Sequence, residues 1–395
     1  MGLYITMYNF FCKILALSLG EQTGIVASEL YGARKYTEMK HSFVYSMMTA
    51  TASLIVIVLP IYFFSYDILS LIGVEHVVAS LTSTILYISL PIALVTVYGE
   101  QVKAYCYSQG IEDYFGYINI VSFVITSPLM YVFMVSWDLE IYGFIYARII
   151  GELFNFAVYI AIYYKRGDER VIGFEKPPMD VKTIATYFLT CIKFAATNYV
   201  ESIGFEVNTI YVGLLSDTKA LAAYVLWVNV VEIVFLMGIG LSNVVRTRIN
   251  TFFGMKKIST ARNFFWWFFR FNIGLGLIMG ISVSLMRNYI AHLYSDNEGI
   301  TSLLSQMLMI WGLFSFLDFN ITTIMTAYRS LGIVSYLIMV DIIVYLPLVC
   351  ILSYVGLFVF KFKIWFLMVS FACSQGITVA ILVNKLRTAD WSRGT

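Results

Sequence analysis

Residues 194–213 read FAATNYVESIGFEVNTIYVG and place polar and acidic side chains inside a long apolar run. The polar positions are Asn198, Glu201, Glu206 and Asn208. A charged side chain at the centre of a bilayer costs about 2.5–3.5 kcal/mol on insertion scales, so such residues mark ion or substrate pathways by default. The stretch therefore predicts a proton or cation site within a membrane span. The alternative is that each acid pairs with a Lys or Arg of a neighbouring helix.

The two glutamates of this stretch do not share one helix face. Glu201 and Glu206 are five positions apart, so an ideal helix of 3.6 residues per turn directs them roughly 140° apart. Both can line one cavity only if the helix bends or the cavity wraps around it. Gly204 between them could allow such a bend.

The composition predicts a polytopic membrane protein. Of 395 residues, 60% are hydrophobic and 13% are charged, and the mean hydropathy is +0.80. A net charge of +2 gives no indication of nucleic-acid binding. The histidines and cysteines are scattered singly, without metal-ligand or disulfide spacing. The sequence has no P-loop and no Ser-His-Asp set, so we expect neither an enzyme nor a cofactor or metal.

Hydrophobic segments of the length that a bilayer requires follow one another along the chain. Their long apolar runs favour helices over the alternating pattern of a β-barrel. The predicted class is therefore all-α. The eleven predicted spans are residues 3–32, 41–66, 79–107, 114–136, 140–164, 183–213, 218–252, 263–286, 300–328, 333–357 and 362–385.

Lys and Arg are concentrated in the loops of one side, around residues 34–40, 165–182, 256–262 and 385–393. The positive-inside rule places these loops, and with them the C-terminus, in the cytoplasm, although it does not say which membrane the chain occupies. The longest polar stretch lies at residues 166–182 and contains Pro177 and Pro178. We interpret it as a linker between an N-terminal lobe of five spans (1–165) and a C-terminal lobe of six (183–395).

An internal repeat accounts for the odd number of spans. Gly32 and Gly254 each close a span just before a basic pair, and Gly110 and Gly332 each precede an Ile, with the same offset of 222 positions. The halves are thus predicted to be parallel copies about an axis normal to the membrane. The counterpart of 183–213 would precede residue 1, so we expect the first lobe to lack its first helix. Lipid, a partner helix or another subunit would then fill the gap.

Several motifs occur in a recognisable order. A Tyr-Gly-Ala sequence ends the first span at residues 31–33, and VESIGFE at residues 200–206 carries both glutamates. Asp318 and Arg329 are separated by eleven positions, and Gly240 and Arg248 by eight. By these motifs the chain resembles the multidrug and toxic compound extrusion (MATE) transporters, eukaryotic type, over essentially its whole length. Gly24 stands where the family has an acid, and Gly238 where it has a Pro.

The resemblance implies two helical lobes around a central cleft and alternating access. It implies export of organic cations or xenobiotics in exchange for protons or sodium ions, because proton and cation compete for the same carboxylates. The main candidate residues are Glu201, Glu206 and Asp318. The further candidates are Asn198, Asn229 and Glu232, with Glu21 and Glu100 as weaker ones in the first lobe.

The sequence also allows other interpretations of these residues and of the whole chain. Asp318, Thr322, Thr326 and Arg329 form one polar helix face, which could instead join helices of a lobe through hydrogen bonds. Glu100 could simply pair with Lys103. The chain as a whole could be a non-transporting membrane subunit or scaffold derived from a MATE transporter. It could also be a flippase for a lipid-linked polar substrate.

Overall fold

The computed structural model describes residues 2–178, 181–215 and 217–392. Every regular element in these ranges is a helix and none is a strand, which confirms the predicted all-α class. Within the same ranges, nine helices are long and apolar enough to cross a membrane, or ten if one bent pair counts as a single span. The protein is therefore an integral, multi-pass membrane protein.

Two of the eleven predicted spans differ from simple apolar helices. Residues 183–213 lie in α10 (Val181–Leu214), which is long enough to span but is interrupted by charged and polar residues, so it is too polar to count by composition. Residues 79–107 form α6 (His76–Ile88) and α7 (Leu90–Tyr107), which meet at an angle of 51°. Pro91 lies in the first turn of α7, where a proline fits a helix start and prevents a continuous helix.

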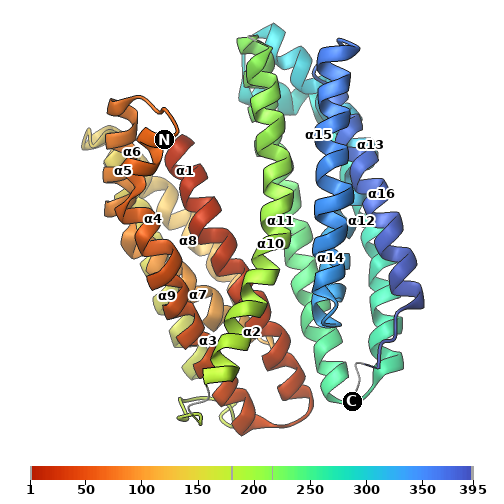
Figure 1. Cartoon of the computed structure of the whole chain (residues 1–395). Coiled ribbons are helices and arrows are strands. Elements are labelled where there is room, and N and C mark those ends of the chain that lie inside the picture. The colour runs from red at the N-terminus through yellow and green to blue at the C-terminus, as the bar shows by residue number, and fades with distance from the viewer. Residues whose placement is uncertain (1, 179–180, 216, 393–395) are drawn as a thin grey trace. The chain divides into compact units, whose positions relative to one another are not determined.

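The chain divides into two compact units (Figure 1). The first contains residues 1–195 and 253–256. Besides α6 and α7, its helices are α1 (Gly2–Tyr8), α2 (Ile14–Gly32), α3 (Tyr36–Ser53), α4 (Leu59–Phe63), α5 (Ser65–Leu71), α8 (Asp113–Tyr131) and α9 (Glu140–Arg166), with the π-helical segments η1 (Asn9–Lys13), η2 (Leu54–Val58) and η3 (Val132–Ser136). In this unit α2 packs against α7 and α3, while α9 packs against α7 and α8.

The second unit contains residues 196–252 and 257–395. Besides the greater part of α10, this unit contains α11 (Thr218–Gly254), α12 (Ile258–Tyr294), α13 (Glu298–Ser330), α14 (Val334–Val340), η4 (Asp341–Tyr345), α15 (Leu346–Tyr354), η5 (Val355–Val359) and α16 (Phe366–Thr388). Consecutive helices α12 and α13 make its most extensive contact, and α16 packs against α13, α15 and η4.

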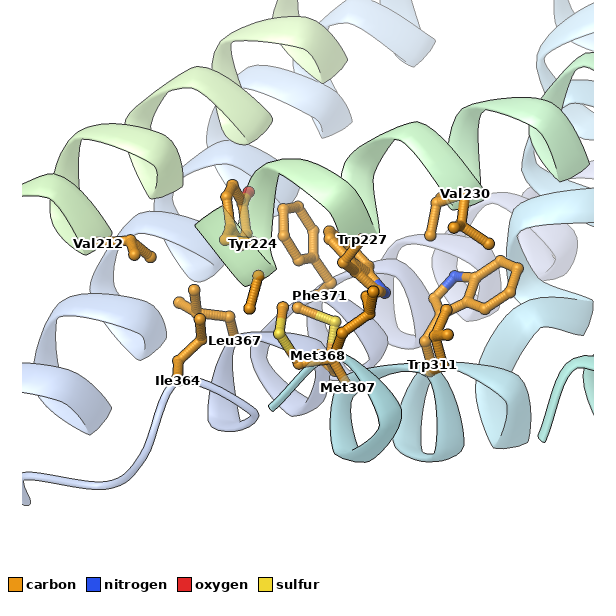
Figure 2. Close-up of a cluster of buried hydrophobic side chains, with 14 of the residues drawn as sticks. Val212, Tyr224, Trp227, Val230, Met307, Trp311, Ile364, Leu367, Met368 and Phe371 are labelled. Atoms are coloured by element: carbon orange, nitrogen blue, oxygen red, sulfur yellow. The ribbon is translucent and has the colours of Figure 1, made fainter. Parts of the chain in front are cut away.

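Large aromatic side chains form the core of the second unit. Figure 2 shows Trp227 of α11 beside Phe371 of α16, and their ring centroids are 5.9 Å apart. Trp311 of α13 belongs to the same buried cluster. Burial of such rings removes a large apolar area from contact with lipid or water and fixes the helices that carry them. The cluster thereby holds the polar residues of α10 and α13 in place.

The predicted repeat is visible in the backbone. Arg34 and Lys256 both adopt a left-handed conformation, at φ 59° and 58°, and Gly110 and Gly332 do so at φ 79° and 76°. Both pairs have the offset of 222 seen in the sequence. A helix end of this type needs one left-handed residue, which only glycine adopts without steric cost. The two halves therefore end corresponding helices in the same way.

Candidate functional site

The candidate site of the second unit is built around Arg329, which is only 4% exposed near the end of α13. Its Nη2 donates hydrogen bonds to Thr197 Oγ1 at 2.5 Å and to Asn198 Oδ1 at 2.8 Å. These bonds tie the end of α13 to α10. They also place the positive charge of a guanidinium beside residues 194–213.

Asp318 lies on the same helix, three turns before Arg329, and is 8% exposed. Its Oδ2 accepts a hydrogen bond of 2.6 Å from the indole Nε1 of Trp311, and Gln375 of α16 lies close to its side chain. Thr322 and Thr326, on the predicted polar face, are buried as well. The face is therefore part of the interior of this unit, and its acid accepts a hydrogen bond from a neutral donor.

Glu201 brings a second carboxyl group to this region. Its side chain is half-buried on α10, and its carboxyl group interacts electrostatically with Asp318, Asp341 and Arg329. Glu206 is exposed, as the angular separation of the two glutamates on a helix predicts. The structure thus brings Glu201, Asp318 and the Asn198 amide into one cluster, and leaves Glu206 outside it.

Two other candidates of the second unit lie elsewhere. Asn229 and Glu232 are both exposed on α11, three positions apart. A separation of three residues puts them on the same side of the helix, as predicted. Their role in binding stays a prediction.

Asp341 and Tyr345 are residues of this region that the sequence analysis missed. Asp341 begins η4 and is 2% exposed, and Tyr345 ends η4 and is 5% exposed. The signal was available: Asp341 is the only acidic residue in the predicted span 333–357. An acidic residue within a membrane span is a functional candidate by default, and this rule applies to Asp341 as it does to Glu201.

The first unit uses its charged residues differently. The Lys103 ammonium and the Glu100 carboxylate form an ion pair one turn apart on α7, as the alternative reading of the sequence expected. The Arg148 guanidinium lies 4.9 Å from the ring centre of Tyr8, in a cation–π contact. Glu21, the other weak candidate, is half-buried on α2 and lies close to Cys191. The Glu100 carboxylate is thus neutralised by its neighbour, in contrast to the carboxyl cluster of the second unit.

The repeat makes this asymmetry explicit. At the offset of 222, Asp318, Arg329 and Asp341 correspond to Thr96, Tyr107 and Asn119. Thr96 shares a hydrogen bond of 2.8 Å with the Tyr8 hydroxyl, and Asn119 accepts one of 3.0 Å from Tyr159. The same positions are thus neutral in one half and charged in the other.

Comparison with known proteins gives consistent results. The MatE family model matches residues 1–132 and 194–355. The human protein "Multidrug and toxin extrusion protein 2" is 24% identical over 196 residues, which are 49% of this chain and 32% of that protein. The matched region thus spans about a third of that relative.

Solved structures show the same fold at low sequence identity. The eukaryotic MATE transporter AtDTX14 is 15% identical, with a TM-score of 0.84 over 99% of this chain and 88% of that chain. The Vibrio cholerae MATE transporter VcmN, in its bent form, is 16% identical, with a TM-score of 0.82 over 98% and 88% of the two chains.

Proposed function

Because this chain belongs to the MatE family, we propose that it is a secondary antiporter that exports organic cations or xenobiotics in exchange for protons or sodium ions. The observation that carries the proposal is the electrostatic interaction between the half-buried Glu201 carboxyl group and the buried Asp318 carboxyl group in the second unit. The similarity to the human "Multidrug and toxin extrusion protein 2" supports xenobiotics as the substrate class.

The proposed coupling follows from competition for these carboxylates. A carboxylate away from bulk water is costly unless a proton or cation neutralises it. An organic cation and a proton that both favour the same site reduce each other's affinity by the same factor, so release of one accompanies binding of the other. Exchange then requires only that the site open alternately to the two sides of the membrane.

The orientation is part of the proposal. The basic residues around 34–40, 165–182, 256–262 and 385–393 support a cytoplasmic location for these loops and for the C-terminal end. Substrate would then be taken from the cytoplasmic side and released on the other, with protons moving inward.

The test is uptake of tetraethylammonium, a permanent organic cation without a titratable group, into proteoliposomes with an acidic lumen. We expect gradient-driven uptake by the full chain, and a loss of at least roughly tenfold for Glu201→Gln and Asp318→Asn, because each removes a carboxylate from a poorly solvated site. Asp296→Asn is the matched control, since Asp296 is exposed in the loop between α12 and α13.

Two results would contradict the proposal. Unchanged uptake by both carboxyl variants would refute the assignment of the site. A correctly folded wild-type chain without gradient-driven flux, which co-purifies stoichiometrically with another membrane protein, would support a scaffold role instead.

A further inference from the structure

A third carboxyl group lies close to Glu201, which itself interacts with Asp318. It belongs to Asp341, whose Oδ2 is buried without a hydrogen-bond partner among the residues that the structure describes. The Asp341 carboxyl group interacts electrostatically with Glu201 and with Arg329. Buried carboxylate oxygens almost always have partners, so a lone one indicates a position that a proton or cation can occupy.

Tyr345, one turn further along η4, has the same property. Its hydroxyl is buried without a hydrogen-bond partner within the described ranges. It interacts electrostatically with Glu201, Asp318 and Asp341, so it faces the same cluster. Both groups belong to a single π-helical turn, and such turns are frequent at functional sites because they redirect side chains within a helix.

The cluster carries a definite charge. Asp341 interacts electrostatically with Glu201 on α10, Arg329 on α13 and Tyr345 of its own turn. Asp318 on α13 interacts with Glu201 and Tyr345, and the neutral side chains of Gln375 on α16 and Tyr224 on α11 lie beside Asp318 and Tyr345. Three ionised carboxylates and one guanidinium leave two negative charges uncompensated. A pair of positive charges must therefore enter before the cluster is neutral.

We propose that Asp341 is a third coupling acid and that Arg329 is a fixed counter-charge, so that the cluster exchanges two protons for each monovalent organic cation. The cluster is then neutral with two protons bound, and it keeps one negative charge when a single organic cation replaces both of them. This inference rests on the proposed function. In each cycle two protons bind two of the three carboxylates from one side and leave on the other, while one organic cation moves in the opposite direction. One net positive charge crosses the membrane with the protons.

Voltage dependence tests this stoichiometry. Proteoliposomes receive a fixed pH gradient and a fixed tetraethylammonium gradient, and potassium with valinomycin sets the membrane potential. We expect wild-type flux to reverse at a potential that corresponds to one net charge per cycle. Asp341→Asn removes one charge from the cluster, so its exchange should become one-for-one and insensitive to voltage. Asp296→Asn should behave as the wild type.

A double variant separates charge from structure. Arg329→Gln combined with Asp341→Asn keeps two carboxylates without the counter-charge, so voltage dependence should return. Asp341→Glu keeps all three carboxyl groups, so its exchange should show the voltage dependence of the wild type. Thermal unfolding of each variant in detergent shows whether it is folded, and if Asp341→Asn does not fold, the reversal potential of the wild type still decides the stoichiometry.

The outcomes are distinguishable. Proton-driven but electroneutral exchange by the wild type would overturn this inference and leave the proposed function intact. Voltage dependence that persists in folded Asp341→Asn would overturn the role of Asp341. No proton-driven flux in the wild type would instead refute the proposed function.

Discussion

The indole Nε1 of Trp311 donates a hydrogen bond of 2.6 Å to Oδ2 of Asp318, two turns further along the same helix. A second buried tryptophan, Trp227, provides a contrast, because its Nε1 has no hydrogen-bond partner among the described residues. Both side chains belong to the same aromatic cluster (Figure 2). The two indoles are thus both buried, but only the N–H group of Trp311 makes a hydrogen bond among the described residues.

Trp311→Phe should therefore destabilise the protein more than Trp227→Phe. The first removes a hydrogen bond to an acid, worth about 1.5–3 kcal/mol if the acid is charged, and leaves Asp318 with one donor fewer. The second removes a buried donor that has no acceptor and loses part of an aromatic contact, so the two effects offset each other. Thermal unfolding in detergent, followed by size-exclusion chromatography, measures the difference. Equal losses for both variants would show that the hydrogen bond contributes nothing.

The same bond shows how far sequence reasoning reaches. Trp311 and Asp318 are seven positions apart, which places them on one helix face, and the apolar runs predicted that helix correctly. An isolated tryptophan among so many aromatic residues gives no sign that its N–H group serves an acid. The sequence therefore predicted Asp318 as a candidate and did not predict its partner.

Helix irregularities were less predictable than helix positions. A bilayer requires every backbone group to be bonded within the span, so long apolar runs imply helices. The π-helical turns η3 and η5 lie 223 positions apart. Each depends on a local change in the backbone hydrogen-bond pattern, and the amino-acid composition gives no sign of that change. Asp341 begins another such turn, and a systematic search for acids within apolar runs would have found it.

Close contact between α12 and α13 gives a second prediction. A Cβ atom at Gly276 would lie 2.6 Å from Cα of Phe316, and one at Gly280 would meet the backbone of Gly312, whereas one at Gly274 would meet nothing within 4 Å. Small residues let membrane helices approach closely. Gly276→Ala and Gly280→Ala should each cost about 1–3 kcal/mol in unfolding free energy.

Gly274→Ala is the matched control on the same helix. It should be neutral, or stabilising by up to about 1 kcal/mol, because alanine is the better helix former. Thermal unfolding of the three variants in one detergent is the measurement. A loss for Gly274→Ala as large as that for Gly280→Ala would show that the contact between the helices does not matter.

The repeat predicts two substitutions with matching effects. Gly110 and Gly332 both have positive φ, and a Cβ atom at either meets nothing within 4 Å, so only backbone strain opposes a side chain there. Gly110→Ala and Gly332→Ala should each lower the unfolding free energy by about 1–2 kcal/mol. Gly213→Ala, in open space on α10 without a positive φ, should not. Clearly unequal losses at the two repeat positions would contradict their structural equivalence.

The loop after α9 should loosen in acid. Asp168 accepts a bond from the Arg170 guanidinium, and mainly for this reason its pKa lies near 2 instead of 3.8. It also accepts a hydrogen bond of 3.1 Å from Tyr31 at the end of α2, and its own backbone N–H donates one of 2.9 Å to Gln109. The carboxylate therefore links its loop to α2 as long as it is ionised.

The sign of the pH dependence follows from the lowered pKa. The stabilisation is complete above the unfolded pKa of Asp168, near pH 4, and is lost as the pH falls toward about 2, because the unfolded chain binds the proton first. A spin label at Glu169→Cys, in a chain with Cys350→Ser and Cys373→Ser, should become more mobile over that range. With Asp168→Asn the label should be mobile at every pH, since the neutral amide cannot pair with Arg170. A label whose mobility titrates identically in both chains, or does not change in the first, would show that the carboxylate does not hold this loop.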